Sequence, residues 1–218
     1  MIDGGAGTSA IPRVIHRIWL GESMPPEAAW FGARWKALHP EWTVRTWRDW
    51  DLPHLRLQRW FDEATTPAMG ADIARLELLQ RHGGVYVDTD VEPLRPLDHL
   101  LAGVSCFLAS EDGRWLGTSI MGAVPGHPFI ASLVDGIPRS VAEHPGAPPN
   151  RQTGPKYVSD RYAEFAAANA DHPVVVFPPS MFYPYHFSEP ERSNEDFPDA
   201  YAVHHWSRSW TAAAGAHR

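Results

Sequence analysis

The run from Gly83 to Val91 (GGVYVDTDV) constrains this chain most, because it indicates a buried β-strand that ends in two aspartates. The apolar stretch Val85 to Val87 suits a strand covered on both faces, and the paired glycines release the chain from a preceding helix. Side chains alternate along a strand, so Asp88 and Asp90 are predicted to point the same way. Carboxylate oxygens are the ligands that hard divalent cations prefer. The run therefore predicts a metal-diphosphate site at a strand end.

Length and charge narrow the class of protein. A chain of 218 residues is long enough for one compact domain with a sizeable core. The formal net charge of −7 comes from interspersed acids and bases, which leaves no basic stripe for nucleic acid or an anionic membrane. A bound phosphate therefore needs a local cation.

Other sequence features bear on the cell compartment. Cys106 is the one cysteine and has apolar neighbours, which is typical of a buried structural thiol in a reducing compartment. No segment approaches the roughly 20 apolar residues of a membrane span, and residues 1–10 lack the apolar core of a signal peptide. We expect a cytoplasmic protein without a transmembrane segment, and peripheral membrane contact stays open.

Helical and strand patterns alternate along the chain, which predicts an α/β layered domain. Besides the aspartate strand, the predicted strands are 13–20, 43–47, 106–110, 119–124, 174–178 and 201–206. The predicted helices are 25–39, 55–64, 68–82, 129–144 and 156–168. Pro and Gly cluster over 145–155, which predicts a mobile loop. We expect flexible ends at 1–10 and 211–218 and a single catalytic domain over 11–210.

Asp72 and Arg75 lie three residues apart on the helix before the aspartates, so they share one face of it. They could form a local ion pair, which on an exposed surface contributes less than ~1 kcal/mol. They could instead clamp sugar hydroxyls, because a guanidinium offers a directional fork of donors. The two residues alone leave both interpretations open.

Aromatic and imidazole side chains mark two further strand ends. Trp19 ends the first predicted strand and could stack on a nucleobase, or be a core residue as one of ten tryptophans. His16 alone indicates a core histidine. Near the C-terminus, His204 or His205 could complete a metal site, since imidazole suits Mn²⁺ better than Mg²⁺. Neighbouring side chains face opposite ways, so at most one of the two is expected to serve.

Taken in chain order, these segments resemble a known family, the DXD-containing sugar transferases of glycosyltransferase family 32. The matching segments are IPRVIHRIWLG (11–21), ADIARL (71–76), HGGVYVDTDV (82–91), TGP (153–155) and HHWSRSW (204–210). The family includes yeast α-1,6-mannosyltransferase relatives, inositol-phosphoceramide mannosyltransferases and bacterial capsular-polysaccharide enzymes. The resemblance spans most of the chain.

The resemblance implies a fold, a reaction and ligands. The fold would be GT-A, a Rossmann-like α/β domain with a mixed central sheet flanked by helices. The reaction would be hexosyl transfer, with retention of anomeric configuration, from a nucleotide sugar to a glycan, lipid-linked or small-molecule acceptor. The cofactors would be Mn²⁺ or Mg²⁺ and a nucleotide sugar, with a UDP-sugar favoured over GDP-mannose.

The resemblance also implies a role for individual residues. Those assigned to catalysis are Asp72, Arg75, Asp88 and Asp90. Those assigned to the metal are Asp88, Asp90 and His205, with Asp90 as the direct ligand. Those assigned to donor binding are Ile18, Trp19, Asp72, Arg75, Tyr86, Asp88, Ser209 and Trp210. The segment 204–210 is further expected to order over the donor when nucleotide and metal bind.

Two other functions share part of this pattern. The sequence DTDV after an apolar strand matches the D-x-D-x-[TV] motif of haloacid-dehalogenase phosphatases, in which Asp88 would be the nucleophile and Asp90 the general acid. That chemistry also needs a downstream lysine and a later acidic pair, whereas Lys156 is the only lysine that follows and no GDxxxD motif does. A non-catalytic nucleotide-sugar or glycan-binding module is the other alternative.

The sequence leaves the retaining mechanism and the acceptor open. Same-face attack, in which the departing phosphate oxygen takes the acceptor's proton, and a covalent carboxylate intermediate are both compatible with it. Glu111 and Asp112 follow a predicted strand and could approach the donor. The aromatic segment 177–187 could line an acceptor cleft or belong to the core.

Overall fold

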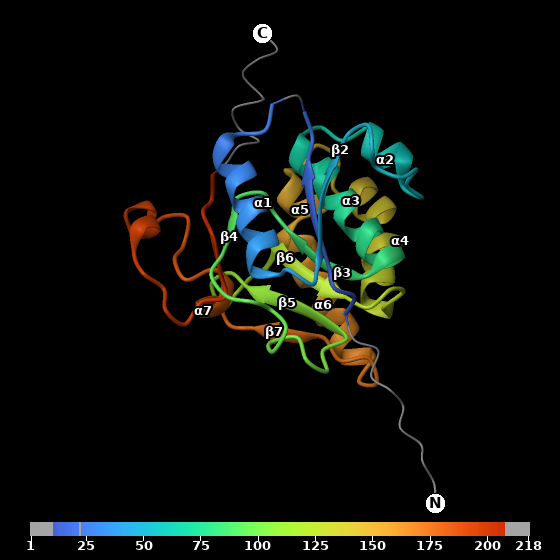
Figure 1. The fold of residues 1–218 in the computed structure, drawn as a ribbon. Helices are drawn as coiled ribbons and strands as arrows, with labels where there is room; N and C mark the ends of the chain where they lie inside the picture. Colours follow the sequence, from blue (N-terminus) through green and yellow to red (C-terminus); the bar gives the residue numbers. More distant parts are fainter. Residues whose placement is uncertain (1–10, 22, 208–218) are drawn as a thin grey trace, which may run out of the picture.

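A computed structural model describes residues 11–21 and 23–207 of the chain. Its centre is a mixed six-stranded sheet in the order β2-β1-β3-β6-β5-β7, and β4 pairs with β8 in a second, two-stranded sheet (Figure 1). The strands are β1 (Val14–Trp19), β2 (Thr43–Arg48), β3 (Gly84–Val87), β4 (Val91–Pro93), β5 (Cys106–Ser110), β6 (Leu116–Ala123), β7 (Val175–Phe177) and β8 (Ala202–His204).

Helices cover both faces of the central sheet, as the layered α/β prediction requires. The helices are α1 (Pro26–Leu38), α2 (Gln58–Asp62), α3 (Pro67–His82), α4 (Pro128–Glu143), α5 (Pro149–Gln152), α6 (Pro155–Ala168), α7 (Pro179–Phe182) and the 3₁₀ turn η1 (Pro190–Asn194). In Figure 1, α1, β4 and α7 lie on one side of the sheet, and α2, α3 and α4 lie on the other.

The strand directions place the ends of β1 and β3 together. β1 runs parallel to both β2 and β3, with Ile15 opposite Val85. β6 runs antiparallel to β3 and to β5, and β5 is parallel to β7. The carboxyl ends of parallel strands meet at one edge of a sheet, so residues that follow β1 and β3 lie at the same edge.

Two apolar cores lie on opposite faces of the sheet, and β3 contributes to both. Val85 and Val87 pack in the core that contains Trp35 of α1, whereas Tyr86 packs in the core with α3, α4 and α6. Because successive strand side chains alternate in direction, one short apolar strand can serve two layers. The sequence prediction of a strand covered on both faces is confirmed.

The boundary between α3 and β3 depends on local sequence signals. Thr66 caps α3 by accepting a hydrogen bond from the Met69 backbone N–H, and Pro67 occupies the first turn. Gly83 and Gly84 both have positive φ values, +62° and +95°, and a Cβ on either one would collide with neighbouring backbone. A glycine pair is therefore what allows the chain to leave α3 and enter β3 directly.

Most predicted elements agree with the structure to within a few residues, but some short ones were missed. The segment predicted as a loop over 145–155 contains α5, and β4, α7 and η1 had no prediction. The two aspartates do not lie on β3, because that strand ends at Val87 and Asp88 begins a turn. No described helix combines the length and apolar composition that crossing a bilayer needs. The division into domain and flexible ends stays a prediction.

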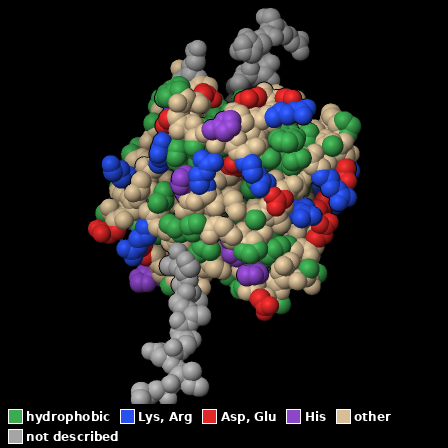
Figure 2. Space-filling model, turned by 90° about the vertical axis from the view of Figure 1, so that its right-hand side faces the viewer, with side chains coloured by type: hydrophobic (Ala, Val, Ile, Leu, Met, Phe, Trp, Pro, Cys, Tyr) green, Lys and Arg blue, Asp and Glu red, His purple; other side chains and the backbone are tan. Residues whose placement is uncertain are grey.

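Charged side chains of both signs share the face of the surface that Figure 2 shows. On the face shown in Figure 2, Lys and Arg side chains are interspersed with Asp, Glu and apolar side chains. That face carries no continuous basic stripe of the kind that nucleic acid binding needs.

Candidate metal and donor site

The aspartate motif forms a tight turn between β3 and β4. The Asp88 backbone N–H donates to the Ser119 carbonyl of β6 at 2.7 Å, which extends the β3–β6 ladder by one bond. The Val91 N–H then donates to the Asp88 carbonyl at 3.2 Å and closes the turn. Asp88 and Asp90 therefore converge because of turn geometry, which corrects the strand alternation predicted from sequence.

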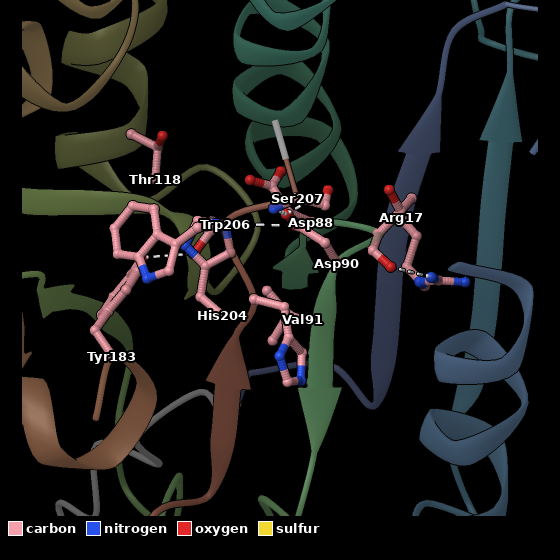
Figure 3. Close-up of polar contacts among 12 residues, drawn as sticks. Arg17, Asp88, Asp90, Val91, Thr118, Tyr183, His204, Trp206 and Ser207 are labelled. Atoms are coloured by element: carbon pink, nitrogen blue, oxygen red, sulfur yellow. Dashed lines mark hydrogen bonds and ion pairs between the residues drawn. The ribbon is translucent and has the colours of Figure 1, made fainter. Parts of the chain in front are cut away.

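A late strand brings an imidazole to this turn. β8 pairs with β4 so that His204 lies opposite Val91. Candidate ligand atoms of Asp88, Asp90 and His204 all lie within 4.8 Å of one another. Figure 3 shows these side chains gathered where β3, β4 and β8 meet. Two carboxylates and one imidazole form a ligand set that fits Mn²⁺ or a similar divalent cation.

Charge within the cluster favours an ionised carboxylate beside an imidazole. Burial alone would raise the pKa of Asp90, but contacts with His204 and Ser207 outweigh it and hold that pKa well below its ordinary value. Burial alone would lower the pKa of His204, but the carboxylate of Asp90 outweighs it and raises that pKa. The buried Nδ1 of His204 has no hydrogen-bond partner among the described residues. An ionised acid and an unpartnered imidazole nitrogen fit a bound cation.

The helix pair predicted from sequence forms a charged chain behind the cluster. Arg75 Nη2 lies 3.1 Å from Asp72 Oδ1 and 3.4 Å from Asp88 Oδ1. The side chains of Asp72 and Arg75 are only 7% and 5% exposed, so this pair is not the solvated surface pair of the alternative interpretation. Arg75 instead connects α3 to the first aspartate of the motif and orients it. Contact of Asp72 and Arg75 with a donor sugar stays a prediction.

Neighbouring polar groups hold this charged chain in place. Burial raises the pKa of Asp72 to about 6, although Arg75 and a 2.8 Å hydrogen bond from the Thr153 hydroxyl act in the opposite direction. Arg75 also donates to the Thr118 carbonyl, and its guanidinium lies over the Tyr86 ring. The TGP segment thus has a defined task, since its threonine fixes the buried acid that orients Arg75.

Tyr86 was assigned to donor binding, and the structure places it beneath the site. It is 1% exposed, and its hydroxyl donates to Asp88 Oδ1 at 2.6 Å. Ile18, also assigned to the donor, has its side chain in the core with α3. Both residues are placed to shape the site from below, and any contact of Ile18 with a donor would involve its backbone.

His205, which the resemblance assigned to the metal, lies outside the cluster, and His204 lies within it instead. The Nε2 atom of His205 is 2.9 Å from Glu92 Oε2, and its ring stacks on Phe31 at a centroid distance of 5.2 Å. Successive residues of a strand face opposite ways, so with His204 toward the turn His205 faces α1. The pairing register of β4 and β8 determines which of the two histidines faces the turn, and no local sequence signal predicts that register.

Trp19 ends β1 at the edge where the aspartate turn lies, as predicted. Its side chain is half-buried, and its indole N–H is buried without a hydrogen-bond partner among the described atoms. A buried donor without a partner suits a polar group of a ligand. Stacking on a base stays a prediction. Ser209 and Trp210, also assigned to the donor, lie outside the described residues.

Ser207 belongs to the site and was missed by sequence reasoning. Its backbone N–H and its hydroxyl both donate to Asp90 Oδ2 at 2.9 Å. The preceding Trp206 has a φ of +54°, a value that bulky residues rarely adopt, and this turns Ser207 toward the aspartate. No local motif predicts such a contact, because it depends on how the chain leaves β8.

Glu111, noted in the sequence only for following a strand, lies close enough to the cluster to interact with it. Burial raises the pKa of Glu111 to about 7, and the charges of His204 and Asp88 also act on it. Nearby, the Ser119 hydroxyl donates to the hydroxyl of Tyr183 at 2.7 Å, so the residue that directly follows α7 also reaches the site. A carboxyl group that titrates near neutral pH is a candidate for proton transfer in this region.

The phosphatase alternative lacks its required cation. Lys156, the only lysine after the motif, pairs with Asp160 one turn along α6, at 2.8 Å. Its ammonium also lies over the Trp115 ring. The described structure therefore gives Lys156 a surface role, and the phosphate-binding lysine of a haloacid-dehalogenase site has no counterpart in it.

Comparisons with known proteins agree with this geometry. Residues 31–106 match the family model described as "Glycosyltransferase sugar-binding region containing DXD motif". Inositol phosphoceramide mannosyltransferase 3 of Schizosaccharomyces pombe is 29% identical over 222 residues, which cover 92% of this chain and 61% of the relative. Mannosyl phosphorylinositol ceramide synthase SUR1 of Saccharomyces cerevisiae is 33% identical over 136 residues, which cover 58% of this chain and 35% of the relative. The chain thus spans less than two thirds of either relative's length.

Solved structures share the fold. The PaToxG glycosyltransferase aligns with a TM-score of 0.57 at 15% identity, over 74% of this chain and 73% of that one. The UDP-bound glycosyltransferase domain of the YGT toxin aligns with a TM-score of 0.55 at 12% identity, over 77% of this chain and 79% of that one.

The mixed sheet and the carboxylate turn at its edge define the class: this is a GT-A-type glycosyltransferase fold. Within that class, residues 31–106 are similar to the family of glycosyltransferases with a DXD-containing sugar-binding region, which is the family that the motifs in chain order resemble.

Proposed function

We propose that this chain is a metal-dependent glycosyltransferase that moves a sugar from a nucleotide-sugar donor to an acceptor hydroxyl. The observation that carries the proposal is the convergence of Asp88, Asp90 and His204 at one edge of the sheet. The family match over residues 31–106, which contains the first two of these residues, supports it.

The proposed roles follow from the charge that develops during transfer. Cleavage of the sugar–phosphate bond builds negative charge on the leaving diphosphate, and the bound cation would supply Lewis-acid stabilisation of that charge. Asp88, Asp90 and His204 would hold the cation. Arg75 keeps Asp88 oriented through its 3.4 Å contact. Preorganised ligands of this kind avoid a reorganisation cost during the reaction.

We infer that the donor is a UDP-sugar. The toxin domain that shares this fold was solved with UDP bound, which supports a uridine nucleotide. The yeast relatives are named as mannosyltransferases, so mannose belongs among the sugars to be tested. The orphan indole N–H of Trp19 at the end of β1 is the proposed base-side contact.

We also propose that transfer retains the anomeric configuration by same-face attack. In this route the acceptor oxygen bonds to the anomeric carbon as the sugar–phosphate bond breaks, and the departing phosphate oxygen takes the acceptor's proton. The names of the yeast relatives support an inositol-phosphate lipid as one acceptor. Glycans and small metabolites are the other acceptors to test.

A donor screen tests the proposal directly. The purified chain is incubated with UDP-glucose, UDP-galactose, UDP-N-acetylglucosamine and GDP-mannose, with Mn²⁺ or with EDTA, and nucleoside diphosphate release is measured. We expect release from one donor that stops with EDTA. Donor binding without release, with and without acceptors, would indicate the non-catalytic module. Release that EDTA leaves unchanged would contradict the metal-dependent mechanism.

A further inference from the structure

Arg17 of β1 is a buried cation that forms no ion pair among the described residues, although the charge of Asp90 acts on it from a longer distance. Arg17 is 1% exposed, and none of the described carboxylates lies within ion-pair distance of its guanidinium. Burial lowers the pKa of Arg17 to about 10. An unpaired charge is costly to bury unless hydrogen bonds compensate for the lost water, so the contacts of this guanidinium indicate what it does.

Those contacts are mainly to backbone carbonyls from separate parts of the fold. The Nη2 atom donates to the Ala28 carbonyl of α1 at 2.6 Å and to the Thr89 carbonyl at 3.0 Å. Nη1 makes a longer contact of 3.4 Å with the Thr46 hydroxyl of β2. One side chain thus joins β1, β2 and α1 to the turn between β3 and β4.

The Thr89 carbonyl lies at the centre of the aspartate motif. Thr89 separates Asp88 from Asp90, so the orientation of its two peptide bonds sets how the flanking carboxylates face one another. Arg17 is the only hydrogen-bond donor to that carbonyl among the described residues. Figure 3 shows Arg17 on the opposite side of Asp88 and Asp90 from His204.

We propose that Arg17 is a positioning residue for the metal site, which holds the backbone of the Asp88–Asp90 turn so that both carboxylates face one cation. The inference rests on the proposed metal-dependent function for its purpose, but the clamp itself is a property of the metal-free chain. Its effect would be that of a group behind the metal ligands, whose loss typically weakens metal affinity about 10- to 100-fold.

Gly32 of α1 supplies a second, independent probe of the clamp. A Cβ at this position would collide with Arg17 Nη1 and reach its Cζ. Gly32→Ala therefore displaces the guanidinium without removing its charge. In an ordinary helix the same change stabilises, because alanine has the higher helix propensity. The propensity effect alone would stabilise the protein, so faster exchange at the aspartate turn in this variant would have to come from displacement of the guanidinium.

The test uses Arg17→Met, Arg17→Gln, Arg17→Lys and Gly32→Ala, with Lys36→Gln as the matched control. Lys36 lies on the same helix as Gly32 and lines the same pocket between α1 and β2, but among the described residues it forms no hydrogen bond or ion pair with the turn. Two quantities are measured without any donor: amide hydrogen exchange over residues 88–91 in the metal-free chain, and the dissociation constant for Mn²⁺.

We expect Arg17→Met and Gly32→Ala to speed exchange over 88–91 and to weaken Mn²⁺ binding about 10- to 100-fold. Arg17→Lys and Arg17→Gln should lose less, because each keeps one donor for the Thr89 carbonyl. Lys36→Gln should match the wild type in both. If Arg17→Met does not fold, Gly32→Ala and Arg17→Gln decide the result.

Two outcomes separate this inference from the proposed function. Wild-type exchange and wild-type Mn²⁺ affinity in folded Arg17 and Gly32 variants would overturn the positioning role and leave the metal site intact. A wild-type chain that binds no Mn²⁺ would overturn the proposed function, and with it the purpose assigned to Arg17, whatever the exchange data show.

Discussion

His204 Nε2 lies 3.4 Å from Asp90 Oδ1, although 114 positions separate the two residues along the chain. The contact joins the turn after β3 to the last strand, β8, through the pairing of β4 with β8. Because one partner is a carboxylate and the other an imidazole, the same contact serves as an ion pair without metal and as part of a ligand set with metal.

Metal affinity should depend on pH through His204. The pKa of His204 is raised above its ordinary value by Asp90, against the effect of burial. A cation must displace the proton on the imidazole, so Mn²⁺ affinity should rise by about tenfold per pH unit below the raised pKa and level off above it. Calorimetric titrations with Mn²⁺ from pH 6 to 9 measure this.

In His204→Asn the same titrations should give weaker binding with a flat pH profile. If His204→Asn kept the wild-type dependence of Mn²⁺ affinity on pH, the displaced proton would belong to another group, and His204 would not be a ligand.

The same pair should stabilise the metal-free fold over a limited pH range. The lowered pKa of Asp90 contributes stability at pH values above its unfolded value near 3.8. This stability is lost as pH falls through the folded value. The raised pKa of His204 contributes stability below its unfolded value near 6.5, and this stability is lost as pH rises through the folded value. Denaturant unfolding with EDTA should therefore show the largest cost of His204→Gln between about pH 4 and 6.5. An equal cost at pH 9 would contradict the pairing.

Asp90→Ala should abolish metal-dependent transfer and leave the fold intact, because the aspartate offers a ligand oxygen rather than core volume. Loss of this contact should reduce turnover at least ~100-fold. Asp199→Ala, on an exposed loop, is the matched control and should behave as the wild type. Near-normal, still metal-dependent turnover in Asp90→Ala would remove the central claim about the motif.

Trp19→Ala should weaken binding of the free nucleoside diphosphate by ~1–3 kcal/mol if the ring stacks on the base. Trp19→Phe should recover part of that loss. Trp50, which is 74% exposed on the loop after β2, provides a control substitution to alanine. Isothermal titration with UDP and Mn²⁺ gives the affinities. Unchanged affinity in a folded Trp19→Ala chain would place this residue with the core.

Glu111→Gln should make the metal-free chain more stable at alkaline pH. Burial raises the pKa of Glu111 from 4.5 to about 7, so the folded state favours the neutral acid. The associated stability is complete below pH 4.5 and is lost as pH rises through about 7. At pH 8 the variant should exceed the wild type by up to ~3 kcal/mol in unfolding free energy, and at pH 4.5 the two should be equal. Equal stability at both pH values would show that Glu111 is solvated.

Sequence patterns found the parts of the fold that depend on local chemistry. The Gly83–Gly84 pair and the apolar run before Asp88 each carry their own physical signal, and the structure confirms both. Motifs in chain order also indicated the family. These inferences succeed because turn conformation and strand burial are decided within a few residues of the signal.

Contacts between segments that are far apart in the sequence could not be predicted from such local patterns. Selection of His204 over His205, the contact of Ser207 with Asp90, and the hold of Arg17 on the Thr89 carbonyl each depend on which strands pair and in which register. A one-residue change of register reverses the face on which every side chain of a strand lies. The sequence by itself thus determined the class of ligand atoms and the strand end that carries them. Only the tertiary structure decided which side chains meet there, because pairing between distant segments sets the directions in which those side chains point.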